Sequence, residues 1–261
     1  MKIIGLKKTQ KYISYAIIIL VLIWAINGTN TSLNKFVSGI PEIFNYFREM
    51  LPPDYSILPR LVDKVGETIQ IAIMGTLLGT LIALPLSFMA ARNVMKIRIV
   101  YQLTRGFFDV CRGISEVVWA LIFVAMVGLG PFPGVLALSV HLAGALGRYF
   151  SEAIETVDPE IIRAIRSTGA KRMHVITNAY IPEIKPLFFN YILYYFEHSI
   201  RAATVLGLVG AGGIGFELLT SIRLFRLRET SMILIVIVIL VILVDRTSAY
   251  IRSKSANIKE S

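Results

Sequence analysis

The chain has 261 residues and a formal net charge of +10; 55% of its residues are hydrophobic and only 17% are charged. The mean hydropathy of +0.68 is too high for a soluble domain of this length, so the composition indicates a membrane protein. Basic residues lie between long apolar runs, which favours the loops of a membrane protein over nucleic-acid binding. Cys111 is the single cysteine, which excludes an internal disulfide and a cysteine-based metal site.

A helix needs about 20 apolar residues to cross a bilayer, and the uncharged intervals predict six such spans. The first has its core at 12–26 and follows four lysines. Because no small-residue cleavage site follows Ile26, we expect a retained signal anchor rather than a removed signal peptide. The second span is expected between Glu67 and Arg92.

The third and fourth spans share one uncharged interval, from Val117 to Gly147. This interval is too long for one helix, and two glycine–proline turns at 128–134 divide it. We expect the third span to begin near Arg112 and the fourth to end near Phe150.

The fifth span is expected to start near Pro186, and the sixth covers 231–244 and continues towards Tyr250. Six spans place both termini on one side of the membrane. Basic residues cluster at both termini and in the loops that would share that side, so the positive-inside rule predicts a cytoplasmic location for both termini. Three arginines would face outward against this rule, and no role is predicted for them: Arg223, Arg226 and Arg228.

A glycine-rich segment, LGLVGAGGIGFELL at 206–219, contains the spacing G-x-G-x-x-G of dinucleotide-binding folds. No strand-like run follows it, and the next apolar run is a membrane span, so we reject a dinucleotide site. Two compatible interpretations remain. Small residues permit close packing of helices in lipid, and free backbone N–H groups at a helix N-terminus after Gly215 would bind an anion.

The loop at 158–186 predicts a short amphipathic helix on the cytoplasmic side. Asp158 suits the N-cap and Gly169 suits the left-handed position that ends a helix. Ile161, Ile162 and Ile165 would form its apolar face. The helix either lies on lipid or provides a docking element for a cytoplasmic partner.

This loop resembles the "EAA" loop of type I ABC importer permeases, whose pattern is E-A-A-x3-G-x9-I-x-L-P. Aligned on Gly169, the chain matches at three further positions, Ala164, Ile181 and Pro182, and departs at three others, Arg163, Ile165 and Ala179. Three further stretches are similar to phosphonate-type permease subunits: 112–138, 166–172 and 201–218. Methionine-type permeases share a similar glycine segment.

The resemblance implies an all-α polytopic membrane fold and a homodimer of this subunit. It also implies an ATPase dimer on the cytoplasmic loops and an external phosphonate-binding protein. The chain has no Walker A motif, so ATP and Mg²⁺ would be bound by the partner ATPase, and no cofactor or metal is expected in this chain. Residues expected to couple to the ATPase lie in the loop at 151–185: Asp158, Ile161, Ile162, Ala164, Ile165, Gly169, Ala170 and Pro182.

The expected organisation has three parts. Residues 1–60 hold the signal anchor and an external segment, residues 61–250 form the transmembrane permease domain, and residues 251–261 form a cytoplasmic tail.

Charged groups inside spans are costly and are candidates for function. Arg112 and Glu116 have i, i+4 spacing, which predicts an intramembrane ion pair. Glu197 and Arg201 repeat this spacing near the middle of the bilayer. The planar fork of Arg201 suits a tetrahedral oxyanion, or Glu197 neutralises it and both support packing only. The candidate substrate pathway comprises Glu197, His198, Arg201, Thr204, Gly210, Gly212, Gly213 and Gly215.

The expected function is therefore that of a permease subunit in the cell membrane, which translocates phosphonate, or phosphite or phosphate, while a separate subunit hydrolyses ATP. A methionine-type permease is the alternative within transport. A membrane-embedded enzyme would need a catalytic or metal cluster, and the three histidines lie far apart in the sequence.

Overall fold

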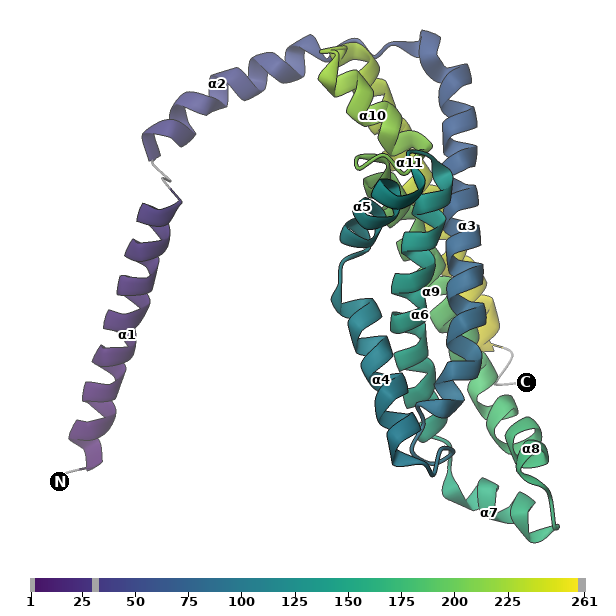
Figure 1. Ribbon diagram of the computed structural model, residues 1–261. Coiled ribbons are helices and arrows are strands. Elements are labelled where there is room, and N and C mark those ends of the chain that lie inside the picture. Colours follow the sequence, from purple (N-terminus) through teal and green to yellow (C-terminus); the bar gives the residue numbers. More distant parts are fainter. Residues whose placement is uncertain (1–2, 30–32, 258–261) are drawn as a thin grey trace. The chain divides into compact units, whose positions relative to one another are not determined.

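The structure is a computed structural model that describes residues 3–29 and 33–257. The described residues contain helices and turns but no strand, which confirms the expected all-α class (Figure 1). It also removes the βαβ unit that a dinucleotide site would need. The chain separates into two compact units, Met1–Pro52 and Pro53–Ser261, which are described separately below.

The first unit contains helices α1 (Ile3–Gly28) and α2 (Leu33–Glu49). Residues 11–28 of α1 are long and apolar enough to cross a membrane, as the first predicted span requires. No residue from 11 to 29 is buried by protein. Such a surface suits contact with lipid.

The second unit is a bundle whose long helices lie side by side, with shorter helices toward both ends (Figure 1). Its helices are α3 (Leu58–Met89), α4 (Arg98–Gly113), α5 (Glu116–Val127), α6 (Pro131–Glu155), α7 (Pro159–Ser167), α8 (Arg172–Val175), α9 (Ile181–Gly207), α10 (Gly213–Arg223) and α11 (Leu227–Asn257). A 3₁₀ turn at Tyr55–Ile57 precedes α3, and a π-helical turn at Ile176–Tyr180 joins α8 to α9.

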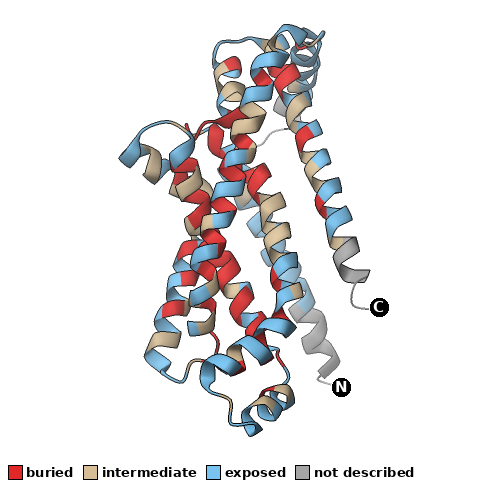
Figure 2. Ribbon diagram, turned by 90° about the vertical axis from the view of Figure 1, so that its right-hand side faces the viewer, coloured by how far each residue is buried: buried red, intermediate tan, exposed pale blue. Residues whose placement is uncertain are grey.

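Helix α6 is the centre of this bundle, because it packs against α3, α4, α5 and α9. Buried residues are concentrated where the long helices face one another (Figure 2). Glycines of α3 permit its closest contact. A Cβ on Gly75 would lie 2.6 Å from the Cβ of Leu138, and one on Gly79 would lie 2.7 Å from the Cβ of Leu142. Small residues therefore let the α3 backbone approach α6, as is typical of helix pairs in lipid.

By length and apolar character, three described helices qualify as membrane spans, α1, α3 and α11, or four if α4 and α5 are counted as one bent span. Helices α6 and α9 lie at the positions of the predicted fourth and fifth spans and have 25 and 27 residues, but they are not among the helices that meet this criterion. The total of six spans stays a prediction.

The expected third span differs from the structure. Instead of one helix beginning near Arg112, α4 ends at Gly113 and α5 begins at Glu116, with an angle of 87° between them. Ile114 and Ser115 have extended backbone angles at this break, and the Ser115 hydroxyl caps α5 by accepting from the Val117 N–H at 3.3 Å. With 12 residues, α5 alone is about 18 Å long, too short to cross a bilayer.

The fifth predicted span begins earlier than expected. Helix α9 starts at Ile181 rather than near Pro186, and the π-helical turn connects it directly to α8. Pro182 is tolerated because it lies in the first turn, where a backbone N–H has no partner within the helix.

Candidate functional site

The glycine segment connects α9 to α10 through a turn in which Gly210, Gly212 and Gly213 have positive φ angles of 96°, 76° and 69°. Helix α10 begins at Gly213, not after Gly215 as expected. Its first N–H groups already have acceptors on α3. Gly213 N–H donates to Glu67 Oε1 at 3.0 Å, and the next N–H, of Ile214, donates to Thr68 Oγ1 at 2.9 Å.

The anion expected at this helix N-terminus is therefore supplied by the chain itself, as the Glu67 carboxylate. These two N–H groups are not available to an external anion in this structure. The packing interpretation fits better. A Cβ on Gly215 would collide with the Thr204 carbonyl oxygen, and one on Gly207 would lie 2.6 Å from the Gly212 carbonyl oxygen.

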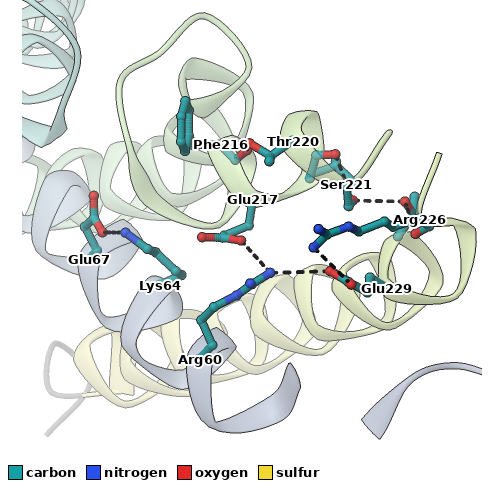
Figure 3. Close-up of polar contacts among 11 residues, drawn as sticks. Arg60, Lys64, Glu67, Phe216, Glu217, Thr220, Ser221, Arg226 and Glu229 are labelled. Atoms are coloured by element: carbon teal, nitrogen blue, oxygen red, sulfur yellow. Dashed lines mark hydrogen bonds and ion pairs between the residues drawn. The ribbon is translucent and has the colours of Figure 1, made fainter. Parts of the chain in front are cut away.

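Ion pairs join α3 to α10 and to the start of α11 (Figure 3). Arg60 lies between Glu217, at 2.8 Å, and Glu229, at 3.5 Å, and Arg226 also contacts Glu229 at 3.3 Å. On the same side, Lys64 contacts Glu67 at 2.7 Å, so the cap of α10 is itself paired.

The three arginines without a predicted role thus have different environments. Arg226 belongs to this network. The Arg228 carbonyl oxygen accepts from the Asp54 N–H at 3.2 Å. Arg223 is exposed in the last turn of α10, where a cation stabilises the helix dipole.

Arg201 belongs to a second network, between α9 and α11. Its Nη1 lies 2.7 Å from Asp245 Oδ1 and 3.2 Å from Glu197 Oε1. Arg252 approaches the other oxygen of Glu197 at 3.1 Å. Two carboxylates therefore neutralise two guanidinium groups, which favours the packing alternative for Glu197 and Arg201. The Thr204 hydroxyl bonds within α9, to the Arg201 carbonyl oxygen at 2.6 Å. The contact of Arg201 with substrate stays a prediction.

The predicted pair of Arg112 with Glu116 does not form in this structure. Arg112 contacts Asp109 on α4 at 3.2 Å, whereas Glu116 lies beyond the break, on α5. An i, i+4 pair requires one continuous helix, and Ser115 interrupts it.

Glu116 instead faces two histidines on other helices. Its Oε2 lies 3.7 Å from Nε2 of His141 on α6, and its Oε1 lies 3.7 Å from Nε2 of His198 on α9. Sequence reasoning missed this cluster because it treated the histidines as distant from one another. The available signal was three ionisable residues in apolar spans, which are expected to face the bundle interior.

A cavity of about 520 Å³ adjoins this cluster. Its lining comprises Asp109, Arg112, Gly113, His141, Ala145, Arg148, Tyr149 and Tyr195. Arg148 contacts Glu152 at 2.7 Å and lies 3.9 Å from Asp109. Two guanidinium groups and two phenols therefore face a space that contains one lining carboxylate. This composition suits an anion.

The predicted cap residues of the loop helix are confirmed. The Asp158 carboxylate accepts from the Glu160 N–H at 2.8 Å, α7 ends at Ser167, and Gly169 has a φ of +80°. The apolar face does not lie open to lipid, because Ile162 is buried and Ile161 and Ile165 pack against the same hydrophobic core. The opposite face, which includes Ala164, is exposed. Ala170 packs against the core, and Pro182 is exposed at the start of α9.

Known proteins are similar to this chain in sequence and in fold. Residues 83–254 match the family described as binding-protein-dependent transport system inner membrane component. The phosphite transport system permease protein PtxC of Stutzerimonas stutzeri is 39% identical over 216 residues, which cover 83% of this chain and 78% of that protein. The phosphate-import permease protein PhnE of Mycolicibacterium smegmatis is 35% identical over 218 residues, 83% of this chain and 40% of that protein.

A solved structure has the same fold. It is an inward-facing conformation of the MetNI methionine ABC transporter, with a TM-score of 0.66 and 22% identity, covering 77% of this chain and 99% of that one. The expected type I ABC importer fold is confirmed by this likeness, which at this identity concerns the fold alone. Membership of the matched family implies a multi-pass membrane protein that acts with an ATPase and a binding protein. Because the family match covers well over half of the chain, this protein belongs to the binding-protein-dependent transport system inner membrane components, the permease subunits of ABC importers.

Proposed function

We propose that this chain is the permease subunit of an importer of phosphorus oxyanions: phosphite, phosphonate or phosphate. The observation that supports it most directly is its likeness, over most of its length, to permeases named for phosphite and phosphate. The subunit would act in the cell membrane as a homodimer with both termini cytoplasmic. An external binding protein would deliver the oxyanion, and a partner ATPase dimer would bind ATP and Mg²⁺.

The cavity beside α4, α6 and α9 is the candidate place for the oxyanion to pass. Arg112 and Arg148 can each donate two hydrogen bonds to a tetrahedral oxyanion, and the phenols of Tyr149 and Tyr195 can donate one each. Carboxylates already contact both arginines, so the anion would compete with Asp109 and Glu152. Such competition keeps the site weak, which a pathway needs in order to release its cargo.

Helix α7 is the candidate coupling element. Its buried face, with Ile162, packs on the bundle, and its exposed face is free to contact a partner. Closure of the ATPase dimer would move α7 as a rigid lever and shift the adjoining α6 and α9. Gly169 terminates this lever in a left-handed conformation that a branched residue adopts only under strain.

Replacement Gly169→Val tests the lever. We expect substrate-stimulated ATP hydrolysis and uptake to fall together, while the subunit still assembles with the ATPase. Gly106→Ala on α4 is the matched control, because a Cβ there meets no atom within 4 Å. If Gly169→Val retains wild-type substrate-stimulated ATP hydrolysis and uptake, the loop has no role in coupling.

Uptake in reconstituted vesicles tests the function itself. The vesicles contain this chain, its ATPase and its binding protein, and receive labelled phosphonate, phosphite, phosphate or methionine in turn. The proposal expects ATP-dependent uptake of a phosphorus oxyanion. Uptake of methionine alone would assign the protein to the methionine-type branch and contradict the proposal.

A further inference from the structure

The side chains of Glu116, His141 and His198 converge from α5, α6 and α9 on one point within the bundle. One ligand atom of each lies within 4.8 Å of the other two. Their side chains are 20%, 15% and 36% exposed, so all three are partly shielded from solvent. The imidazole rings of the two histidines are stacked, with centroids 6.4 Å apart.

The hydrogen bond of His141 fixes which of its nitrogen atoms faces Glu116. Nδ1 lies 3.2 Å from the Ile114 carbonyl oxygen, which can only accept, so Nδ1 carries the proton. In the neutral imidazole, Nε2 then has a lone pair and no hydrogen. This lone pair faces a carboxylate oxygen at 3.7 Å, a distance too long for a direct hydrogen bond.

For Glu116 and His141 this arrangement places lone pairs opposite one another, and a positive charge between them would stabilise it. Among the described residues, the ion pairs of Glu116 involve only these two histidines, and no lysine or arginine fills this role. The network of Arg201 differs, because each of its carboxylates contacts a guanidinium group.

We propose that Glu116, His141 and His198 form a binding site for a divalent transition-metal ion of the zinc type. Imidazole nitrogen and carboxylate oxygen are ligands that such ions prefer. A tetrahedral zinc ion with bonds of about 2.1 Å places its ligand atoms about 3.4 Å apart. One ligand atom from each of the three residues lies within 4.8 Å of the others, so side-chain rotations that shorten these separations by up to about 1.4 Å would complete the site.

Two further features are those of a metal site. A histidine ligand almost always donates its other ring N–H to a carbonyl or carboxylate, as His141 does to Ile114. Three protein ligands also leave a coordination position open to water or an anion. His141 lines the adjoining cavity, so this position has a neighbouring space for such a ligand.

A metal titration of the purified full-length subunit tests the site. The protein is prepared without a polyhistidine tag, treated with a chelator, and titrated with Co²⁺ while the visible absorption of the bound ion is recorded. Zn²⁺ is then measured by competition. The expected result is one site per chain, with Co²⁺ bands of a low-coordinate nitrogen and oxygen environment that Zn²⁺ displaces.

The variants are Glu116→Gln, His141→Ala and His198→Gln. Each removes one ligand and is expected to weaken binding at least about tenfold. Glu116→Gln preserves side-chain shape, so it keeps the test valid if His141→Ala fails to fold. The matched control is His174→Ala, because His174 is the third histidine and is exposed on α8.

Absence of a one-to-one site, or wild-type affinity in Glu116→Gln and His198→Gln, would overturn the proposal. Either result would mean that Glu116, His141 and His198 do not hold a metal ion. Because the titration uses the isolated subunit and no solute, its outcome is independent of which substrate the importer carries.

Discussion

The charged side chains of two regions of the bundle have different partners. At the junction of α9, α10 and α11, the chain supplies its own partners: Asp245 and Glu197 hold Arg201, and Glu67 holds the start of α10. Between α4, α5, α6 and α9, two histidines face the carboxylate of Glu116, which contacts no lysine or arginine of the described part of the chain. A cavity lined by two arginines lies beside them.

The comparison of these two regions shows that a charged residue in a membrane span does not by itself indicate a ligand site. Arg201 and Glu197 lie on one unbroken helix and form an ion pair, and Asp245 and Arg252 of α11 extend the network. Glu116 begins a new helix, so it is separated from Arg112 and meets histidines on other helices. Of these two regions, the one with capacity for a ligand is therefore the one where the break between α4 and α5 separates Glu116 from Arg112.

Adding a side chain where α9 and α10 pack closely should have the largest effect on stability. In Gly215→Ala the new methyl group meets the Thr204 carbonyl oxygen, which belongs to the α9 backbone and cannot rotate away. We expect a loss of about 3 kcal/mol or more in the free energy of unfolding. Chemical denaturation in detergent, at fixed protein concentration, measures it.

Gly106→Ala serves as the control for that variant, because its methyl group enters open space on α4. It should stabilise the protein by about 0.5–1 kcal/mol, the usual difference between alanine and glycine in a helix. Equal stability of the two variants would contradict the close packing of α9 against α10.

Removing one charge from the ion-pair network between α9 and α11 should have the next largest effect on stability. Arg201→Gln leaves Asp245 and Glu197 opposite the single guanidinium of Arg252. Arg201 is 40% exposed, so we discount the cost of a fully buried pair and expect a loss of about 2 kcal/mol.

The double variant Arg201→Gln/Asp245→Asn restores the balance, because the pair of Glu197 with Arg252 remains. It should recover at least half of the lost stability in the same denaturation experiment. A double variant as unstable as Arg201→Gln alone would mean that Asp245 does not contribute to the network.

Weakening the cap of α10 should have the smallest effect of these changes. Glu67→Gln keeps an acceptor for the Gly213 N–H but removes the negative charge at the helix N-terminus and the pair with Lys64. We expect a loss of about 1 kcal/mol in the free energy of unfolding. Asp63→Asn, an exposed carboxylate on the same helix, should change it by less than about 0.5 kcal/mol. Equal losses of stability in both variants would mean that Glu67 does not stabilise the start of α10.

Local features of the fold could be predicted from the sequence. The loop helix follows directly from Asp158 at its start and Gly169 after its end, because both act on neighbouring backbone groups. The break after Gly113 also has a local signal, the serine cap at Ser115, which the prediction of one span from Arg112 overlooked.

The candidate sites could not be predicted in the same way. Glu116, His141 and His198 come from three helices, and their separation depends on how α5 and α9 pack on α6. The capping of α10 by Glu67 joins residues 146 positions apart. Periodicity identifies helices and their apolar faces, but it contains no information on which polar side chains of different helices meet.

The most direct test of this account compares two variants in the reconstituted importer. Arg148→Gln removes a guanidinium group from the open cavity, and Arg201→Gln/Asp245→Asn removes a neutralised pair from the closed network. ATP-dependent uptake of labelled phosphite, phosphonate or phosphate is measured for each against the unmodified chain. We expect Arg148→Gln to lose most of its oxyanion uptake and the double variant to retain it. Full uptake in Arg148→Gln, with uptake lost in a stable double variant, would place the oxyanion at Arg201 and contradict the account.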